Sequence, residues 1–127
     1  MTIWLPDVEQ VTLFHEKLIR QTGGAEGARS MALVESAINR ANASFGGVDA
    51  WKSLEQKAAA VACGLVQNHG FVDGNKRVGI AVMLLILRKN GYSLAYAQPE
   101  LIALGLDMAT GKADVSAVTA WIQAHQA

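Results

Sequence analysis

Apolar residues recur at helical spacing in the first third of the chain and predict two helices there. The first stripe covers residues 8–18, behind Asp7 at the helix start, and stops at Gly23-Gly24. The second stripe covers residues 31–41 and fades at 44–47, where we expect a polar, glycine-bearing connection. Helix signals recur along the chain, whereas the period of two that marks a half-buried strand does not.

Two further helices are predicted in the middle of the chain. Ser53 and Gln56 match the capping-box pattern, so a third helix begins there and runs towards Asn68. A fourth helix runs from about Asn75 to Asn90 and is apolar on nearly every face. We expect this fourth helix to be the central, buried one.

The last part of the chain completes the predicted fold. Residues 92–97 are a short extended candidate, Pro99 begins a fifth helix that closes near Gly111, and Asp114 caps a sixth. No internal repeat, low-complexity tract or linker divides residues 1–127. The sequence therefore predicts one all-α domain, a bundle of about six helices around the fourth helix.

Composition narrows the classes of partner. The 127 residues include 11 basic and 11 acidic side chains, so no net field favours nucleic acid or an anionic membrane. The single cysteine, Cys63, lies in an apolar stretch and allows neither a disulfide framework nor a Cys/His metal site. The N-terminus lacks a basic region followed by an apolar one, and the apolar runs are short. We therefore expect a soluble, intracellular protein with no membrane partner and no direct nucleic-acid binding.

The residue types that carry chemistry gather at residues 69–77, His-Gly-Phe-Val-Asp-Gly-Asn-Lys-Arg, between the third and fourth predicted helices. Free backbone N–H groups at the start of the fourth helix favour an anion, so phosphate chemistry is the first hypothesis. A histidine side chain ordinarily titrates near neutrality, which makes His69 the candidate general base. Phe71 offers no chemistry and is interpreted as the anchor that holds the loop to the core.

The second half of this loop leaves alternatives open. Asp73 either binds a divalent cation that rides on nucleotide phosphates, orients an incoming hydroxyl, or caps the next helix. Gly74 permits positive φ and close approach to a ligand, and Asn75 is either an N-cap or a phosphate ligand. Lys76 and Arg77 oppose the helix macrodipole, so a bound phosphate explains them better than helix stability does. A solvated pair of surface charges is the alternative for these two cations.

Residues 69–77 resemble the signature loop of the Fic/Doc family. Its pattern is His, any residue, Phe, any residue, Asp or Glu, Gly or Ala, Asn, Gly or Lys, Arg, and all seven constrained positions match. The surrounding layout resembles the short death-on-curing (Doc) branch, with a Gly-Gly loop after the first helix, Asn68 before the motif and Asn90-Gly91-Tyr92 after its helix. The resemblance covers most of the chain and implies a Fic/Doc-like helical fold.

The family resemblance implies transfer of part of a nucleoside triphosphate to a protein hydroxyl, with ATP and Mg²⁺ bound. His69 would deprotonate the acceptor, Asp73 would serve the metal and the acceptor, and Asn75, Arg77 and the loop amides would hold phosphates. The predicted catalytic residues are His69, Asp73, Lys76 and Arg77. The predicted phosphate-binding residues are Gly74, Asn75, Lys76 and Arg77.

Three departures separate the chain from AMP-transferring members of the family. Those members usually have Pro after the histidine, Gly at position 76 and a second arginine at position 80, whereas this chain has Gly70, Lys76 and Ile80. The Doc branch shares these changes and resembles a kinase that phosphorylates a threonine of elongation factor Tu, which arrests translation. We therefore predict transfer of the γ-phosphate of ATP. AMP transfer and a catalytically inert helical interaction module are the alternatives.

The Doc resemblance also implies the toxin of a type II toxin–antitoxin system in the bacterial cytoplasm. A Phd-like antitoxin, whose C-terminal segment folds onto the toxin, would hold it in check. The target segment would lie near Trp51. Residues 22–27 match by letter the inhibitory pattern of other Fic proteins, but Gly23-Gly24 lies inside the match and an inhibitory glutamate needs a helix to aim it. We therefore expect inhibition by a separate protein.

Overall fold

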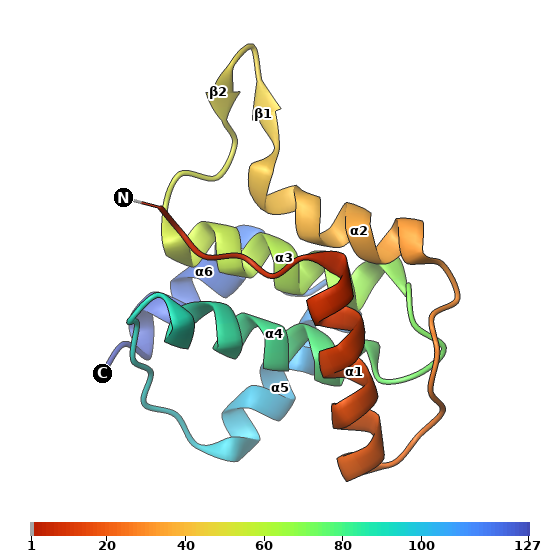
Figure 1. Ribbon diagram of the computed structural model, residues 1–127. Helices are drawn as coiled ribbons and strands as arrows, with labels where there is room; N and C mark the ends of the chain where they lie inside the picture. Colours follow the sequence, from red (N-terminus) through yellow and green to blue (C-terminus); the bar gives the residue numbers. More distant parts are fainter. Residues whose placement is uncertain (1) are drawn as a thin grey trace.

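The computed structural model describes residues 2–127 and is mainly helical (Figure 1). α3 and α4 run side by side through the middle of the molecule. α2 and α6 pack on α3, and α5 packs on α3 and α4. The predicted all-α bundle of about six helices is confirmed. The helices are α1 (Val8–Thr22), α2 (Met31–Asn39), α3 (Leu54–Asn68), α4 (Asn75–Lys89), α5 (Gln98–Ala109) and α6 (Val115–Ala124).

Short polar side chains cap four of these helices. Asp7, Ser30, Ser53 and Asp114 each accept a hydrogen bond from the backbone N–H three residues further on, which satisfies one of the free donors of a first turn. The predicted start sites of α1, α3 and α6 are thereby confirmed. α4 and α5 begin without such a side-chain cap, at Gly74 and Ala97 respectively. The first N–H groups of α4 are left for another acceptor.

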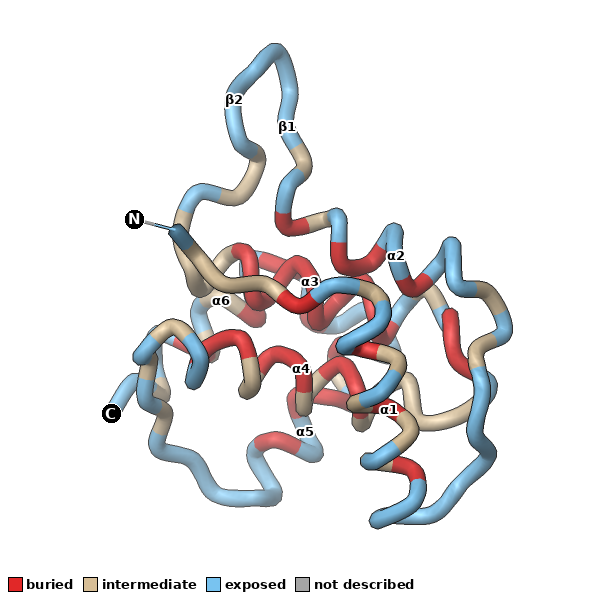
Figure 2. The backbone as a smooth tube through the Cα atoms, viewed as in Figure 1, coloured by how far each residue is buried: buried red, intermediate tan, exposed pale blue. Residues whose placement is uncertain are grey.

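The centre of the bundle is shared between α3 and α4. All of residues 57–66 in α3 are buried (Figure 2). Several of these residues are small, which lets neighbouring helices approach closely. A Cβ on Gly64 would lie 2.9 Å from the Cα of Ala37, and one on Gly79 would lie 2.5 Å from Val66 Cγ2. We expected α4 to be the central, buried helix, but α3 shares this place and α4 buries mainly one side. The buried residues of α4 are Val78, Gly79, Val82, Met83, Ile86 and Leu87.

A β-hairpin stands where we expected a connection without strands. After the 3-10 helix η1 (Arg40–Asn42), β1 (Ser44–Phe45) pairs antiparallel with β2 (Val48–Asp49) and projects from the helical body (Figure 1). Gly46 and Gly47 both have positive φ, which suits a two-residue hairpin turn. The prediction missed the hairpin because its strands are two residues long and exposed, so they carry no apolar alternation.

The predicted extended segment 92–97 forms no strand but pairs with the C-terminal end of the chain. A single bridge joins Leu94 to Gln126, and the Ala95 N–H donates to the His125 carbonyl at 2.8 Å. The His125 ring in turn hydrogen-bonds Glu100 at the start of α5. Within residues 2–127, no helix combines the length and the apolar character needed to cross a membrane.

Lys57 is a buried cation at the base of the hairpin. Its ammonium Nζ donates to the Ala41 carbonyl of η1 at 2.9 Å and lies 3.9 Å from Asp49 Oδ2 of β2. The Asp49 side chain is largely exposed, so this ion pair is weak and the bond to Ala41 is the main contact. Lys57 therefore ties the buried helix α3 to the segment that leads into the hairpin.

Replacing Lys57 by Met keeps the apolar stem and removes the donor. We expect Lys57→Met to lower the free energy of unfolding by about 1–3 kcal/mol, because the Ala41 carbonyl loses a charged hydrogen-bond partner. Urea unfolding measures this, with Lys52→Met on the exposed neighbouring lysine as control. Amide exchange in residues 43–50 should also accelerate only in the Lys57 variant. Equal stability of the two variants would contradict the role assigned to Lys57.

Candidate functional site

His69 ends α3 in a backbone conformation that is unfavourable for its residue type. Its φ of 51° and ψ of 45° are left-handed, and it is the sole non-glycine residue with positive φ within residues 2–127. Glycine usually occupies such a helix end, and another residue there costs about 1–3 kcal/mol. The side chain is exposed. Helix termination alone would favour glycine at this position, and the exposed His69 imidazole lies at the entrance to the motif loop.

Gly70 is required by packing against α2. A Cβ at this position would lie 2.7 Å from Val34 Cγ2 and 3.0 Å from the Val34 nitrogen. The Gly70 carbonyl also accepts hydrogen bonds from the backbone N–H groups of Arg29, at 2.8 Å, and Ser30, at 3.0 Å. Since no side chain fits, the absence of proline at this position reflects local packing. It therefore does not discriminate between the two transfer chemistries.

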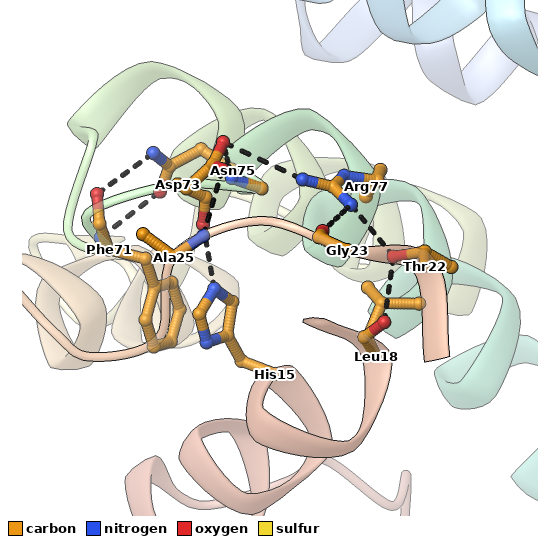
Figure 3. A network of polar contacts seen from close by, with 10 residues as sticks. His15, Leu18, Thr22, Gly23, Ala25, Phe71, Asp73, Asn75 and Arg77 are labelled. Atoms are coloured by element: carbon orange, nitrogen blue, oxygen red, sulfur yellow. Dashed lines mark hydrogen bonds and ion pairs between the residues drawn. The ribbon is translucent and has the colours of Figure 1, made fainter. Parts of the chain in front are cut away.

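Phe71 and Asn75 hold the loop to the core. Phe71 is 1% exposed, as the anchoring role requires. The Asn75 side chain accepts from the Phe71 N–H and donates to the Phe71 carbonyl, both at 3.1 Å (Figure 3). The residue that caps α4 is Gly74, so the Asn75 side chain is not the N-cap and instead braces the loop. The amide has a second N–H, and phosphate binding by Asn75 stays a prediction.

The Asp73 carboxylate lies where three segments meet. Its Oδ1 accepts from the Gly74 N–H at 2.8 Å, its Oδ2 accepts from the Ala25 N–H at 3.1 Å, and Arg77 Nη2 lies 3.6 Å from Oδ1 (Figure 3). The Ala25 and Gly74 N–H groups, with smaller contributions from Arg77 and His15, hold the pKa of Asp73 below its ordinary value. Asp73 does not cap α4. It is an ionised, half-exposed carboxylate with lone pairs left for a metal or a hydroxyl.

The connection between α1 and α2, residues 23–30, lies alongside the motif loop. A bridge pairs Ala28 with Phe71, and the Val72 N–H donates to the Gly27 carbonyl at 3.0 Å. Gly24 approaches most closely, since a Cβ there would lie 2.5 Å from Asp73 Oδ2. We call residues 23–30 the α1–α2 connection, and its backbone forms one wall of the site.

Arg77 is held by the end of α1. Its Nη1 donates to Thr22 Oγ1 at 2.7 Å and to the Gly23 carbonyl at 2.6 Å (Figure 3). Glu26, the glutamate of the inhibitory-like pattern, pairs instead with Arg20 at 2.9 Å. α1 has ended at Thr22, so no helix aims Glu26 at the motif. This arrangement agrees with the interpretation that the letter match at 22–27 is not an inhibitory helix.

His15 is a member of this network that the sequence pattern did not single out. It lies in the apolar stripe of α1, is 1% exposed, and places Nε2 2.7 Å from the Asp73 carbonyl oxygen. Its ring also stacks on Phe71 with centroids 3.9 Å apart. The available signal was a polar residue four positions from both Val11 and Ile19 on a buried face.

A cavity of about 510 Å³ opens beside the two motif cations. Lys76, which is exposed, and Arg77 line one part of it, and α1, α4 and α5 supply mainly apolar side chains elsewhere. Ile80, where AMP-transferring relatives would carry a second arginine, belongs to this apolar wall. Other members of the wall are Leu18, Leu84, Leu101, Ile102 and Leu106.

Comparison with known families agrees with the geometry of this loop. Residues 5–87 match the Fic/DOC family. The chain belongs to this family. The chain is similar to Toxin Doc of Mycolicibacterium smegmatis (strain ATCC 700084 / mc(2)155), with 42% identity over 73 residues, which are 58% of the chain and 56% of that toxin. It is also similar to Protein kinase doc of Escherichia phage P1, with 31% identity over 110 residues, 87% of the chain and 86% of that kinase.

The Fic/DOC site of this chain supplies one carboxylate for a metal. Within residues 2–127, no cluster of three or more His, Cys, Asp or Glu side chains is placed to hold an ion. A single ionised Asp73 fits Mg²⁺ that is held mostly by nucleotide phosphates and water. Cys63 is buried, and burial raises the pKa of its thiol to about 11, so it is no nucleophile.

Gly24 offers a direct test of how the α1–α2 connection positions Asp73. Gly24→Ala would place a methyl group against the Asp73 carboxylate, so we expect the Ala25 N–H bond to break and the pKa of Asp73 to rise towards its ordinary value of 3.8. Titration of the carboxyl carbon by NMR measures this. Gly27→Ala is the matched control, because Gly27 also has positive φ but a Cβ there meets nothing within 4 Å. A pKa of Asp73 that moves equally in both variants would refute the close contact.

Proposed function

We propose that this protein is the toxin of a type II toxin–antitoxin system and transfers the γ-phosphate of ATP to a protein hydroxyl. The observation that carries the proposal is the complete motif at the start of α4, a helix without a side-chain cap, beside a cavity lined by Lys76 and Arg77. Anions bind such helix starts through free N–H groups. The names Toxin Doc and Protein kinase doc of the two relatives support the same reading.

Each motif residue has a role in this reaction. The N–H groups of the first turn of α4, the Arg77 guanidinium and the Lys76 ammonium would hold the phosphates, and Asp73 would hold Mg²⁺. When bound, Mg²⁺ would neutralise phosphate charge. His69 would take the proton of the acceptor hydroxyl as its oxygen bonds to the γ-phosphorus, and the bond to the leaving ADP breaks. Phosphoryl transfer of this kind depends on positioning and charge neutralisation, which the braced loop provides.

The apolar wall at Ile80 favours γ-phosphate transfer over AMP transfer. AMP transfer by related proteins uses a second arginine at this position to hold the outer phosphates. Here the cavity offers no cation at Ile80, and Lys76 adds positive charge closer to the helix start. A nucleotide with its γ-phosphate at the motif meets both cations of the site.

Two protein partners complete the proposal. The first partner is the target, elongation factor Tu. The exposed hairpin, whose Phe45 is 77% exposed, directly precedes Trp51 in the sequence, and the resemblance places the target segment near Trp51. The second partner is a Phd-like antitoxin. Exposed Ile102 and Leu106 on α5, together with Lys76 and Arg77, suit an amphipathic helical segment that carries acidic residues.

A label-transfer experiment tests the reaction type. Purified protein is incubated with Mg²⁺, elongation factor Tu and ATP labelled at either the α- or the γ-phosphate. We expect label only from the γ-position and a threonine that gains one phosphate by mass spectrometry, because in the proposed orientation the γ-phosphate would lie at the motif. Label from the α-position would establish AMP transfer instead, and nucleotide binding by calorimetry without any transfer would establish an inert interaction module.

Substitution of His69 tests the general base. We expect His69→Ala and His69→Asn to lower the transfer rate by about 10²–10⁴-fold and to abolish toxicity, because neither side chain accepts the hydroxyl proton. Asn tolerates the left-handed conformation of this position, so His69→Asn should keep wild-type stability and helical circular dichroism. The exposed neighbour Gln67, changed to Ala, is the control. Growth arrest by either His69 variant would show that another group removes the proton.

A further inference from the structure

His15 is a buried polar side chain to which the proposed reaction gives no role. Lys57 and His15 are the buried polar or charged residues of the core within residues 2–127, and Lys57 is accounted for by its bond to Ala41. His15 lies on α1, 58 positions before Asp73 in the sequence, and contacts the motif loop with both its edge and its face. Burying an imidazole in a helix core is unfavourable unless its polar atoms are used.

The contact with Asp73 fixes where the proton of the His15 ring resides. Nε2 lies 2.7 Å from the Asp73 carbonyl oxygen, and a carbonyl oxygen only accepts hydrogen bonds. Nε2 must therefore carry a hydrogen. The ring plane is held at the same time, because it stacks on Phe71 at an interplanar angle of 8° (Figure 3). One side chain of α1 thus determines the direction of a main-chain carbonyl in the motif loop.

The peptide that His15 holds joins the carboxylate residue to the helix start. The Asp73 carbonyl belongs to the peptide bond with Gly74, whose N–H donates to Asp73 Oδ1 at 2.8 Å. Gly74 has φ +76° and packs on α1 so closely that a Cβ would lie 2.8 Å from Ile19 Cδ1 and 3.6 Å from His15 Nε2. A rotation of this peptide would move the Asp73 carboxylate and the first turn of α4 together.

We propose that His15 is a positioning residue for the motif: its Nε2–H holds the Asp73 carbonyl and thereby orients the Asp73 carboxylate and the N–H groups at the start of α4. Its effect on catalysis rests on the proposed transferase function. Its effect on Asp73 does not. His15 acts on the reaction through the backbone of the loop, since its ring is buried away from solvent.

Two substitutions separate hydrogen bonding from packing. His15→Phe keeps an aromatic ring against Phe71 and removes the donor. His15→Gln removes the ring, but its side-chain amide extends about as far as Nε2 and restores an N–H donor. If His15 served packing alone, Phe would replace it better than Gln. If it positions Asp73, Gln replaces it better than Phe.

The closing experiment has a spectroscopic arm and a kinetic arm. In the wild-type protein without nucleotide, ¹⁵N NMR of the His15 ring should show a hydrogen on Nε2. The Gly74 amide resonance should shift in His15→Phe and return towards its wild-type position in His15→Gln. In the transfer assay, kcat of His15→Phe should fall by about 10- to 100-fold, with KM for ATP within about twofold, and His15→Gln should recover most of the loss.

The outcomes that overturn the inference are distinct from failure of the proposed function. A ring with hydrogen on Nδ1 alone, a Gly74 amide unchanged in His15→Phe, or a fully active His15→Phe refutes positioning by Nε2–H. If the wild-type protein transfers nothing, the proposed function fails and the spectroscopic arm decides the role of His15. Circular dichroism and urea unfolding verify that each variant folds. If His15→Phe does not fold, the Gly74 amide shift and kcat of His15→Gln are compared with those of the wild-type protein.

Discussion

The hydrogen-bonded setting of Asp73 is the interaction on which the rest of the site depends. Its carbonyl is held from α1 by His15, its carboxylate from the α1–α2 connection by Ala25, and its own loop contributes the Gly74 N–H. Arg77 joins the same group through Oδ1. Because these partners come from segments far apart in sequence, the loop acquires its shape only when α1, the connection and α4 are packed together. The geometry of the site is thus a property of the whole bundle.

The start of α4 lacks the side-chain cap that would stabilise its first turn. In four other helices, an Asp or Ser side chain caps the first turn by accepting a hydrogen bond from a backbone N–H group. α4 begins at Gly74 and has no such cap. The Asn75 amide, which has the right chemistry for a cap, is used to hold Phe71. Both observations leave the first turn of α4 open to an anion, and the cations Lys76 and Arg77 add to that preference. The first turns of α4 also pack closely on α3, since a Cβ on Gly79 would lie 2.5 Å from Val66 Cγ2.

Sequence patterns predicted the features of the fold that depend on residues close together in the sequence. The capped starts of α1, α3 and α6 and the position of the motif between two helices follow from spacing within a few residues. The hairpin at Gly46-Gly47 was missed because a two-residue strand has no period to detect. The roles of His15 and Asn75 were not predictable from spacing. His15 meets Asp73 across 58 positions, and the loop conformation decides which group the Asn75 amide reaches.

The three departures from the AMP-transfer pattern do not carry equal weight once the structure is considered. Gly70 is dictated by Val34 of α2, which leaves no space for a proline ring, so it reports on packing. Lys76 is exposed beside the cavity and adds a charge without defining a nucleotide orientation by itself. Ile80 lies in the apolar part of the cavity wall. Within the proposed function, the preference for γ-phosphate transfer therefore rests chiefly on Ile80, because of the three departures it alone places an apolar side chain in the cavity wall.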